Sequence, residues 1–89
     1  MDYSKLLNES DAHKAIHNSG IVLHCNQKGS IMPEYAENYD LLIDYLNNNS
    51  VYQENVSAEQ TKYTFPDGSS IIEHDENLEK VFTIKPYIA

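Results

Sequence analysis

The sequence contains no arginine, only one cysteine and no long apolar stretch, and each of these absences excludes a class of protein. Fourteen acidic residues face six lysines, so the formal net charge is −8. Binding to phosphates requires clustered Lys or Arg, so we expect no direct contact with nucleic acid or an anionic membrane. Any partner recognised through charge should instead be a basic protein.

The location and size of the protein also follow from what is missing. A single cysteine excludes an intramolecular disulfide and suits a reducing compartment. No apolar run approaches the roughly 20 residues that cross a bilayer. The first residues, MDYSKLLNES, lack the basic lead and apolar stretch of a signal peptide. We therefore expect a cytoplasmic protein, and at 89 residues with 40% hydrophobic composition a single domain over residues 1–89.

The N-terminal half of the chain has the pattern of helices around one short strand. Residues 2–19 are predicted to be helical in two pieces, with Ser10 capping the second and Gly20 following its end. The β-branched run at 21–25 predicts a buried strand.

The strongest helical pattern is PEYAENYDLLIDYLNN, residues 33–48. Pro33 suits the first turn of a helix, and the run of asparagines after Leu46 suits its end. Apolar side chains recur along this stretch at helical spacing, namely at Tyr35, Tyr39, Leu42, Ile43 and Leu46.

From residue 50 the pattern changes to a period of two. Strands are predicted at 50–56, 61–65, 70–74 and 78–84, and the last three form a meander. The expected fold is therefore α+β, with two or three helices packed on a small antiparallel sheet that ends in a three-stranded meander.

Four carboxylates lie opposite the apolar stripe of the predicted helix, at Glu34, Glu37, Asp40 and Asp44. Side chains three or four residues apart on a helix are about 5–6 Å apart at Cβ, close to the separation of phosphates along one DNA strand. No lysine lies between residues 29 and 61, whereas a merely solvated helix usually intersperses them. The stripe is either a recognition surface that mimics nucleic acid or a source of solubility. As a recognition surface it would include Tyr45 and Tyr52 as contact residues.

Residues capable of catalysis or metal binding are few. His13 and His17 are four apart on a predicted helix, and His24, Cys25 or His74 would have to complete a tetrahedral metal site. Neighbouring residues of a strand point to opposite faces, so His24 is poorly placed to activate Cys25, and we expect a buried, inert thiol. The isolated glycines form no phosphate loop, and so small a chain has little room for a ligand pocket of roughly 300 Å³ or more. We predict no enzyme activity, no catalytic residue, no cofactor and no metal, with a small His/Cys metal-binding domain as the third alternative.

The segment KYTFPDGSSII, residues 62–72, reads as strand, turn and strand, because Pro66, Asp67 and Gly68 suit a tight turn. It is similar to a β-hairpin stretch in an acidic, DNA-mimicking inhibitor of a type I-F CRISPR surveillance complex. As a small acidic chain without enzyme motifs, the protein resembles phage-encoded anti-CRISPR inhibitors. The resemblance implies a stoichiometric inhibitor that binds a Lys- or Arg-rich groove of a Cascade or Cas subunit in the host cytoplasm, and it transfers no binding residue.

Two further alternatives concern the partner. An immunity-type protein, directed against a basic toxin or nuclease, would use the same electrostatics. A homodimer formed by pairing of edge strands is also compatible with the sequence.

Overall fold

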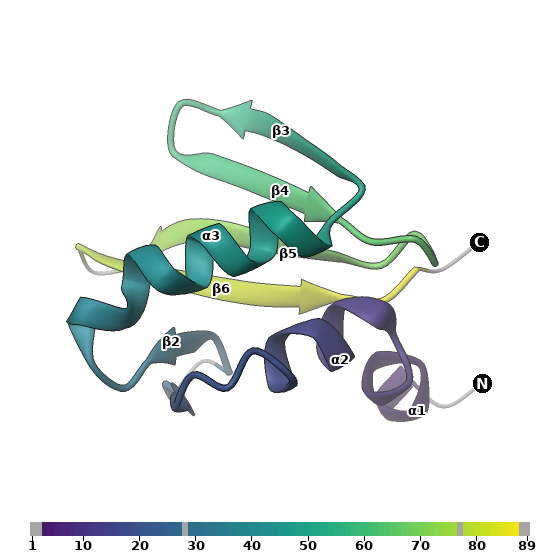
Figure 1. Ribbon diagram of the computed structural model, residues 1–89, viewed down its shortest axis with the longest axis horizontal. Coiled ribbons are helices and arrows are strands. Elements are labelled where there is room, and N and C mark those ends of the chain that lie inside the picture. The colour runs from purple at the N-terminus through teal and green to yellow at the C-terminus, as the bar shows by residue number, and fades with distance from the viewer. Residues whose placement is uncertain (1–2, 28, 77, 88–89) are drawn as a thin grey trace.

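The computed structural model describes residues 3–27, 29–76 and 78–87 and shows an α+β fold (Figure 1). The helices are α1 (Tyr3–Asn8), α2 (Asp11–His17), the short 3-10 helix η1 (Ala36–Asn38) and α3 (Tyr39–Asn49). The strands are β1 (Leu23–Cys25), β2 (Ile31–Pro33), β3 (Tyr52–Ser57), β4 (Gln60–Thr64), β5 (Ser70–Glu76) and β6 (Glu79–Lys85). They form one antiparallel sheet in the order β1-β2-β6-β5-β4-β3.

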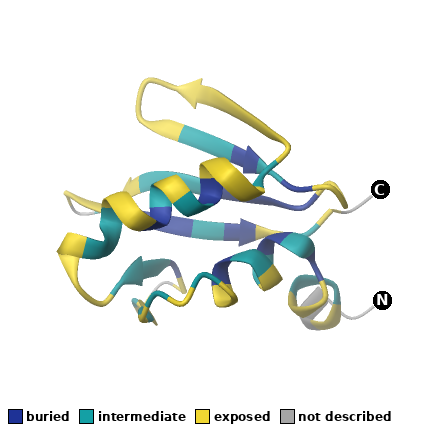
Figure 2. Cartoon of the chain, viewed as in Figure 1, coloured by how far each residue is buried: buried dark blue, intermediate teal, exposed yellow. Residues whose placement is uncertain are grey.

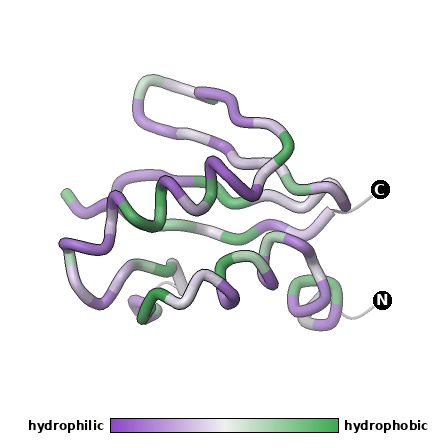
Figure 3. Tube along the Cα trace, in the orientation of Figure 1, coloured by the Kyte–Doolittle hydropathy of each residue, from purple (hydrophilic) through white to green (hydrophobic). Residues whose placement is uncertain are grey.

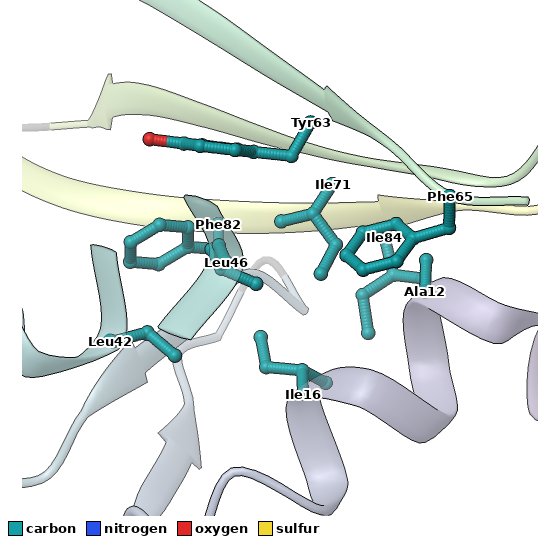
Figure 4. Close-up of a cluster of buried hydrophobic side chains, with 9 residues drawn as sticks. All are labelled: Ala12, Ile16, Leu42, Leu46, Tyr63, Phe65, Ile71, Phe82 and Ile84. Carbon is teal, nitrogen blue, oxygen red and sulfur yellow. The ribbon is translucent and has the colours of Figure 1, made fainter. Parts of the chain in front are cut away.

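The core lies between one face of this sheet and the helices α2 and α3. Figure 4 shows nine buried side chains converging there: Ala12, Ile16, Leu42, Leu46, Tyr63, Phe65, Ile71, Phe82 and Ile84. Along α3, Leu42 and Leu46 are fully buried, and Figure 3 shows hydrophobic and hydrophilic segments alternating along the helix. The apolar stripe predicted from Tyr39 to Leu46 is thus confirmed as the buried side of α3.

The start of α2 is hydrogen-bonded to the turn between β4 and β5. The Ser10 side chain caps the helix by accepting from the His13 N–H, as predicted. Asp11 and Asp67 then exchange bonds, because the backbone N–H of each donates to a carboxylate oxygen of the other at 2.9 and 3.1 Å. The buried Ser69 hydroxyl accepts from the Ala12 N–H at 2.9 Å. These contacts join segments more than fifty residues apart in the chain.

The predicted helix over residues 33–48 is wrong at its N-terminal end. Pro33 belongs to β2 and lies opposite Leu23, and the next residue, Glu34, donates its N–H to the Val22 carbonyl. Tyr35 is extended and 57% exposed, so it is not part of the core. Pairing with β1 holds this segment extended, whereas Pro33 alone suits either a helix start or an edge strand.

The sheet is larger than predicted. It has six strands, because β2 was not predicted as a strand and its last residue, Pro33, was assigned to a helix, and because β3 extends the meander to four antiparallel strands. The strand predicted at 21–25 begins at Leu23, and Cys25 is exposed rather than buried. The sequence run is apolar enough for a core strand, but β1 is placed at the edge of the sheet, where Leu23 packs against the core while His24 and Cys25 meet solvent.

The β3–β4 hairpin extends away from the helices (Figure 1). All six residues of β3 are exposed, including Tyr52 at 57% and Val56 at 53% (Figure 2). In the part of the chain that the structure describes, no helix is long and apolar enough to cross a lipid bilayer.

Candidate functional site

Three of the four predicted carboxylates lie together on the outer side of η1 and α3. Burial of Leu42 and Leu46 turns Glu37, Asp40 and Asp44 toward solvent, and all three are exposed. The ion pairs among the described residues are His24–Glu34 and Lys80–Asp75, so none involves these three side chains. We call Glu37, Asp40 and Asp44 the acidic face of α3.

Glu34 is separate from the acidic face. It directly follows β2, and its Oε2 accepts from Nδ1 of His24 on the neighbouring strand at 2.8 Å. The helical wheel placed Glu34 with the others because it assumed a helix that starts at Pro33. The predicted stripe of four carboxylates is therefore shortened to three.

The two predicted tyrosines do not share a surface with each other. Tyr45 is half-buried and packs against the core on α3. On β3, Gln53 donates to the carbonyl of Asn47 at the end of α3, so Gln53 lies on the helix side of the sheet. Its neighbour Tyr52 points to the opposite side, because side chains alternate along a strand. Tyr52 therefore does not extend the acidic face of α3.

An open cleft of about 600 Å³ lies beside the start of α3. This volume falls in the range of ligand sites, contrary to the expectation from chain length. Its lining comes from β1, β2, η1, α3 and β6 and from the residue after β2: His24, Met32, Pro33, Glu34, Ala36, Tyr39, Glu79 and Lys80. The cleft lies next to the acidic face, because its lining residues Ala36 and Tyr39 directly precede Glu37 and Asp40 in the chain.

Tyr39 connects this cleft to the sheet. Its hydroxyl donates to the carboxylate of Glu73 on β5. Burial, then the hydrogen bond and charge of Glu73, raise the pKa of Tyr39 above its ordinary value, so the phenol stays a neutral donor. This pair was not predicted from the sequence. The one feature of the sequence that points to it is the spacing of Glu73, which lies two residues from Ile71 and therefore on the same, core-facing side of the strand.

The histidines and Cys25 are distributed over several places. His13 and His17 lie together on α2 with ring centroids 4.1 Å apart, and burial, followed by the charge of His17, lowers the pKa of His13. His24 contacts Glu34, and Nε2 of His74 is 2.7 Å from Oγ1 of Thr83. The described residues contain no group of three or more His, Cys, Asp or Glu side chains placed to hold a metal ion.

A second, smaller hollow of about 250 Å³ lies on the side of the sheet opposite α2 and α3. Gln60, Ile72, His74, Thr83 and Lys85 line it.

Comparison with protein-family models, with curated proteins and with solved structures finds no match to this chain.

Proposed function

We propose that the protein is a non-enzymatic inhibitor that uses the acidic face of α3 to bind a basic, nucleic-acid-binding groove of a bacterial defence complex. In this proposal it is a phage-encoded protein of the anti-CRISPR type, acts in the host cytoplasm and mimics DNA. The observation that carries the proposal is the exposure of Glu37, Asp40 and Asp44 along one side, outside every ion pair of the described chain.

The electrostatic reason is that like charges on neighbouring turns repel each other when the protein is free. Such pairs destabilise a helix by a few tenths of a kcal/mol each, roughly 0.2–0.5 kcal/mol. A cationic groove relieves that repulsion and steers the encounter. Leu41, which is 58% exposed and follows Asp40 in the chain, adds apolar contact area beside the acidic face.

The experiment that tests this function is a binding titration with a purified type I-F surveillance complex at increasing salt. We expect the affinity to fall steeply with salt and to fall at least about tenfold in the Asp40→Lys, Asp44→Lys double variant. The matched control is Glu54→Lys with Glu59→Lys, which makes the same change in net charge at exposed positions of the β3–β4 hairpin. Equal affinities of the two double variants would remove the acidic face from the mechanism.

An immunity-type role against a basic toxin or nuclease depends on the same surface. A pull-down from bacterial host lysate, washed at low and high salt, separates the two roles by the partner that is retained. Retention of a toxin or nuclease in place of a Cas subunit would favour immunity. If neither is retained at low salt, the acidic face serves solubility alone.

A further inference from the structure

We propose that the cleft beside α3 binds an arginine side chain of the basic partner. This inference rests on the proposed function and deepens it, because it assigns one residue type of the partner to one place on this protein. It uses the cleft lining and not the acidic face of α3.

The walls of the cleft suit the aliphatic part of an arginine side chain. Met32, Pro33 and Ala36 contribute apolar surface, and Tyr39 contributes an aromatic ring whose hydroxyl is already engaged with Glu73. A guanidinium group can stack on such a ring, and its methylene stem can lie along the apolar side chains.

The charged groups of the cleft leave two carboxylates for a cationic ligand. Lys80 is paired with Asp75 at 2.9 Å, so its charge is compensated within the protein. Glu34 accepts from His24 through Oε2, and no other described side chain donates to its Oε1. Glu79 is exposed and forms no ion pair or side-chain hydrogen bond in the described chain. The His24 bond holds the Glu34 carboxylate in one orientation, which reduces the ordering cost of binding.

Arginine fits this arrangement better than lysine does. Its planar group presents five N–H donors and can bond a carboxylate through two of them, whereas an ammonium is a compact and strongly hydrated point charge. The chain itself contains no arginine, so no second copy of this protein can supply the ligand. The site is thereby restricted to a residue from a different protein.

The experiment is an NMR titration of the full chain with N-acetyl-arginine amide as the probe. We expect saturable shifts centred on Tyr39, Ala36 and His24 with a Kd on the order of 1 mM, the affinity usual for a ligand of this size. N-acetyl-citrulline amide has nearly the same shape without the charge, and should bind at least about tenfold more weakly. The corresponding lysine amide should also bind more weakly than the arginine probe.

Variants locate the binding and separate it from general electrostatic attraction. Glu34→Gln and Glu79→Gln, both at exposed positions, should each weaken binding of the probe several-fold. Asp44→Asn, on the acidic face, is the matched control and should leave it unchanged. Equal weakening by Asp44→Asn, equal binding of citrulline or lysine amide, or shifts spread over all acidic surfaces would each overturn the assignment.

Failure of the arginine assignment can be distinguished from failure of the proposed function. If the arginine probe binds in the cleft but the surveillance complex is not bound, the function is wrong and the site stands. If the complex is bound and the Glu34→Gln, Glu79→Gln variant binds it as tightly as the unmodified protein, the arginine assignment is wrong and the function stands.

Discussion

At the centre of the sheet, β5 and β6 direct Ile71, Phe82 and Ile84 into a core closed by α2 and α3, whereas at one edge every residue of β3 is exposed. Both regions are regular antiparallel structure and both contain aromatic side chains. They differ in what lies above them, because the helices cover the centre and leave β3 uncovered (Figures 1 and 2). The centre should therefore determine stability, and β3 should tolerate change.

Removal of an aromatic ring from each region should give the largest difference. Phe82→Ala should lower the free energy of unfolding by about 3–5 kcal/mol, because the fully buried ring leaves a cavity. Tyr52→Ala, its match on β3, should change that free energy by no more than about 0.5 kcal/mol. Urea denaturation of the two variants measures both values. Similar losses at the two positions would show that β3 contributes to stability as much as the core does.

Serine hydroxyls allow a finer comparison of the same kind. Ser69→Ala should cost about 1–3 kcal/mol, because the Ala12 N–H would stay buried without its acceptor. Ser57→Ala, at the exposed end of β3, should cost much less, since water can replace its hydroxyl. Hydrogen exchange of the Ala12 amide gives an independent readout and should accelerate in Ser69→Ala only. Unchanged exchange at Ala12 would contradict the role assigned to Ser69.

The contact between Asp67 and α2 should make the stability of the fold depend on pH in the acid range. Burial by itself raises the pKa of the Asp67 carboxyl, but hydrogen bonds from the Ser69 hydroxyl and from backbone N–H groups, including that of Asp11, outweigh burial and hold the pKa below its ordinary value. A carboxyl with a depressed pKa in the folded state stabilises the fold above its unfolded pKa of about 3.9. This contribution is lost as the pH falls through the lower, folded pKa.

Thermal unfolding measured at intervals of about one pH unit between pH 6 and pH 2 tests this dependence. The unmodified protein, Asp67→Asn and Glu54→Gln are compared at each pH. Asp67→Asn should be less stable than the unmodified protein at pH 6, and the difference should shrink toward the acid end. Glu54→Gln is the matched control, because the exposed Glu54 side chain makes no hydrogen bond in the described chain. An Asp67→Asn difference that stays constant with pH would mean that charge at this position does not matter.

The smallest expected effect is self-association through the exposed edge. The opposite edge strand, β1, has three residues, whereas β3 has six, with one charged side chain and no proline. The free edge of β3 is thus the better candidate for the homodimer left open by the sequence, although a bulge between Asn55 and Ser57 shortens its regular part. Each copy carries a charge of −8, so any such dimer should be weak and should strengthen with salt.

Sedimentation equilibrium over a range of protein and salt concentrations measures this association. Val56→Lys should reduce it, and Val22→Lys, an equally exposed change near β1, should not. A monomer at every concentration and salt level would exclude pairing through β3. This salt dependence is opposite in sign to that expected for binding to a basic groove, so the two interactions cannot be confused.

Local sequence patterns correctly predicted the elements that depend on a few neighbouring residues. The Ser10 cap, the left-handed Gly20 and the turn at Pro66–Ser69 were all found where the sequence indicated, because each depends on a few neighbouring residues. β4, β5 and β6 lie within one or two residues of their predicted bounds. The exposed carboxylates of α3 were likewise predicted, since amphipathic spacing determines which side of a helix is buried.

Other predictions failed where distant contacts determine the result. Pro33 is compatible with a helix start or with a strand, and only its partner Leu23 in β1 selects the strand. Cys25 is exposed because β1 occupies the edge of the sheet, a position that no local pattern specifies. The cleft was missed altogether, because its walls come from five elements and one connecting residue spread between His24 and Lys80.

The sequence by itself determined a small acidic α+β chain, the capped helix α2, the meander and the buried side of α3. It did so because composition, capping and hydrophobic periodicity act over a few residues. Only the tertiary structure decided that Glu34 leaves the acidic face, that Tyr52 and Tyr45 do not share a surface, and that Tyr39 meets Glu73 beside a cleft. The physical reason is that these outcomes depend on which strands pair and which face the helices cover, and both are determined by contacts between segments remote in the chain.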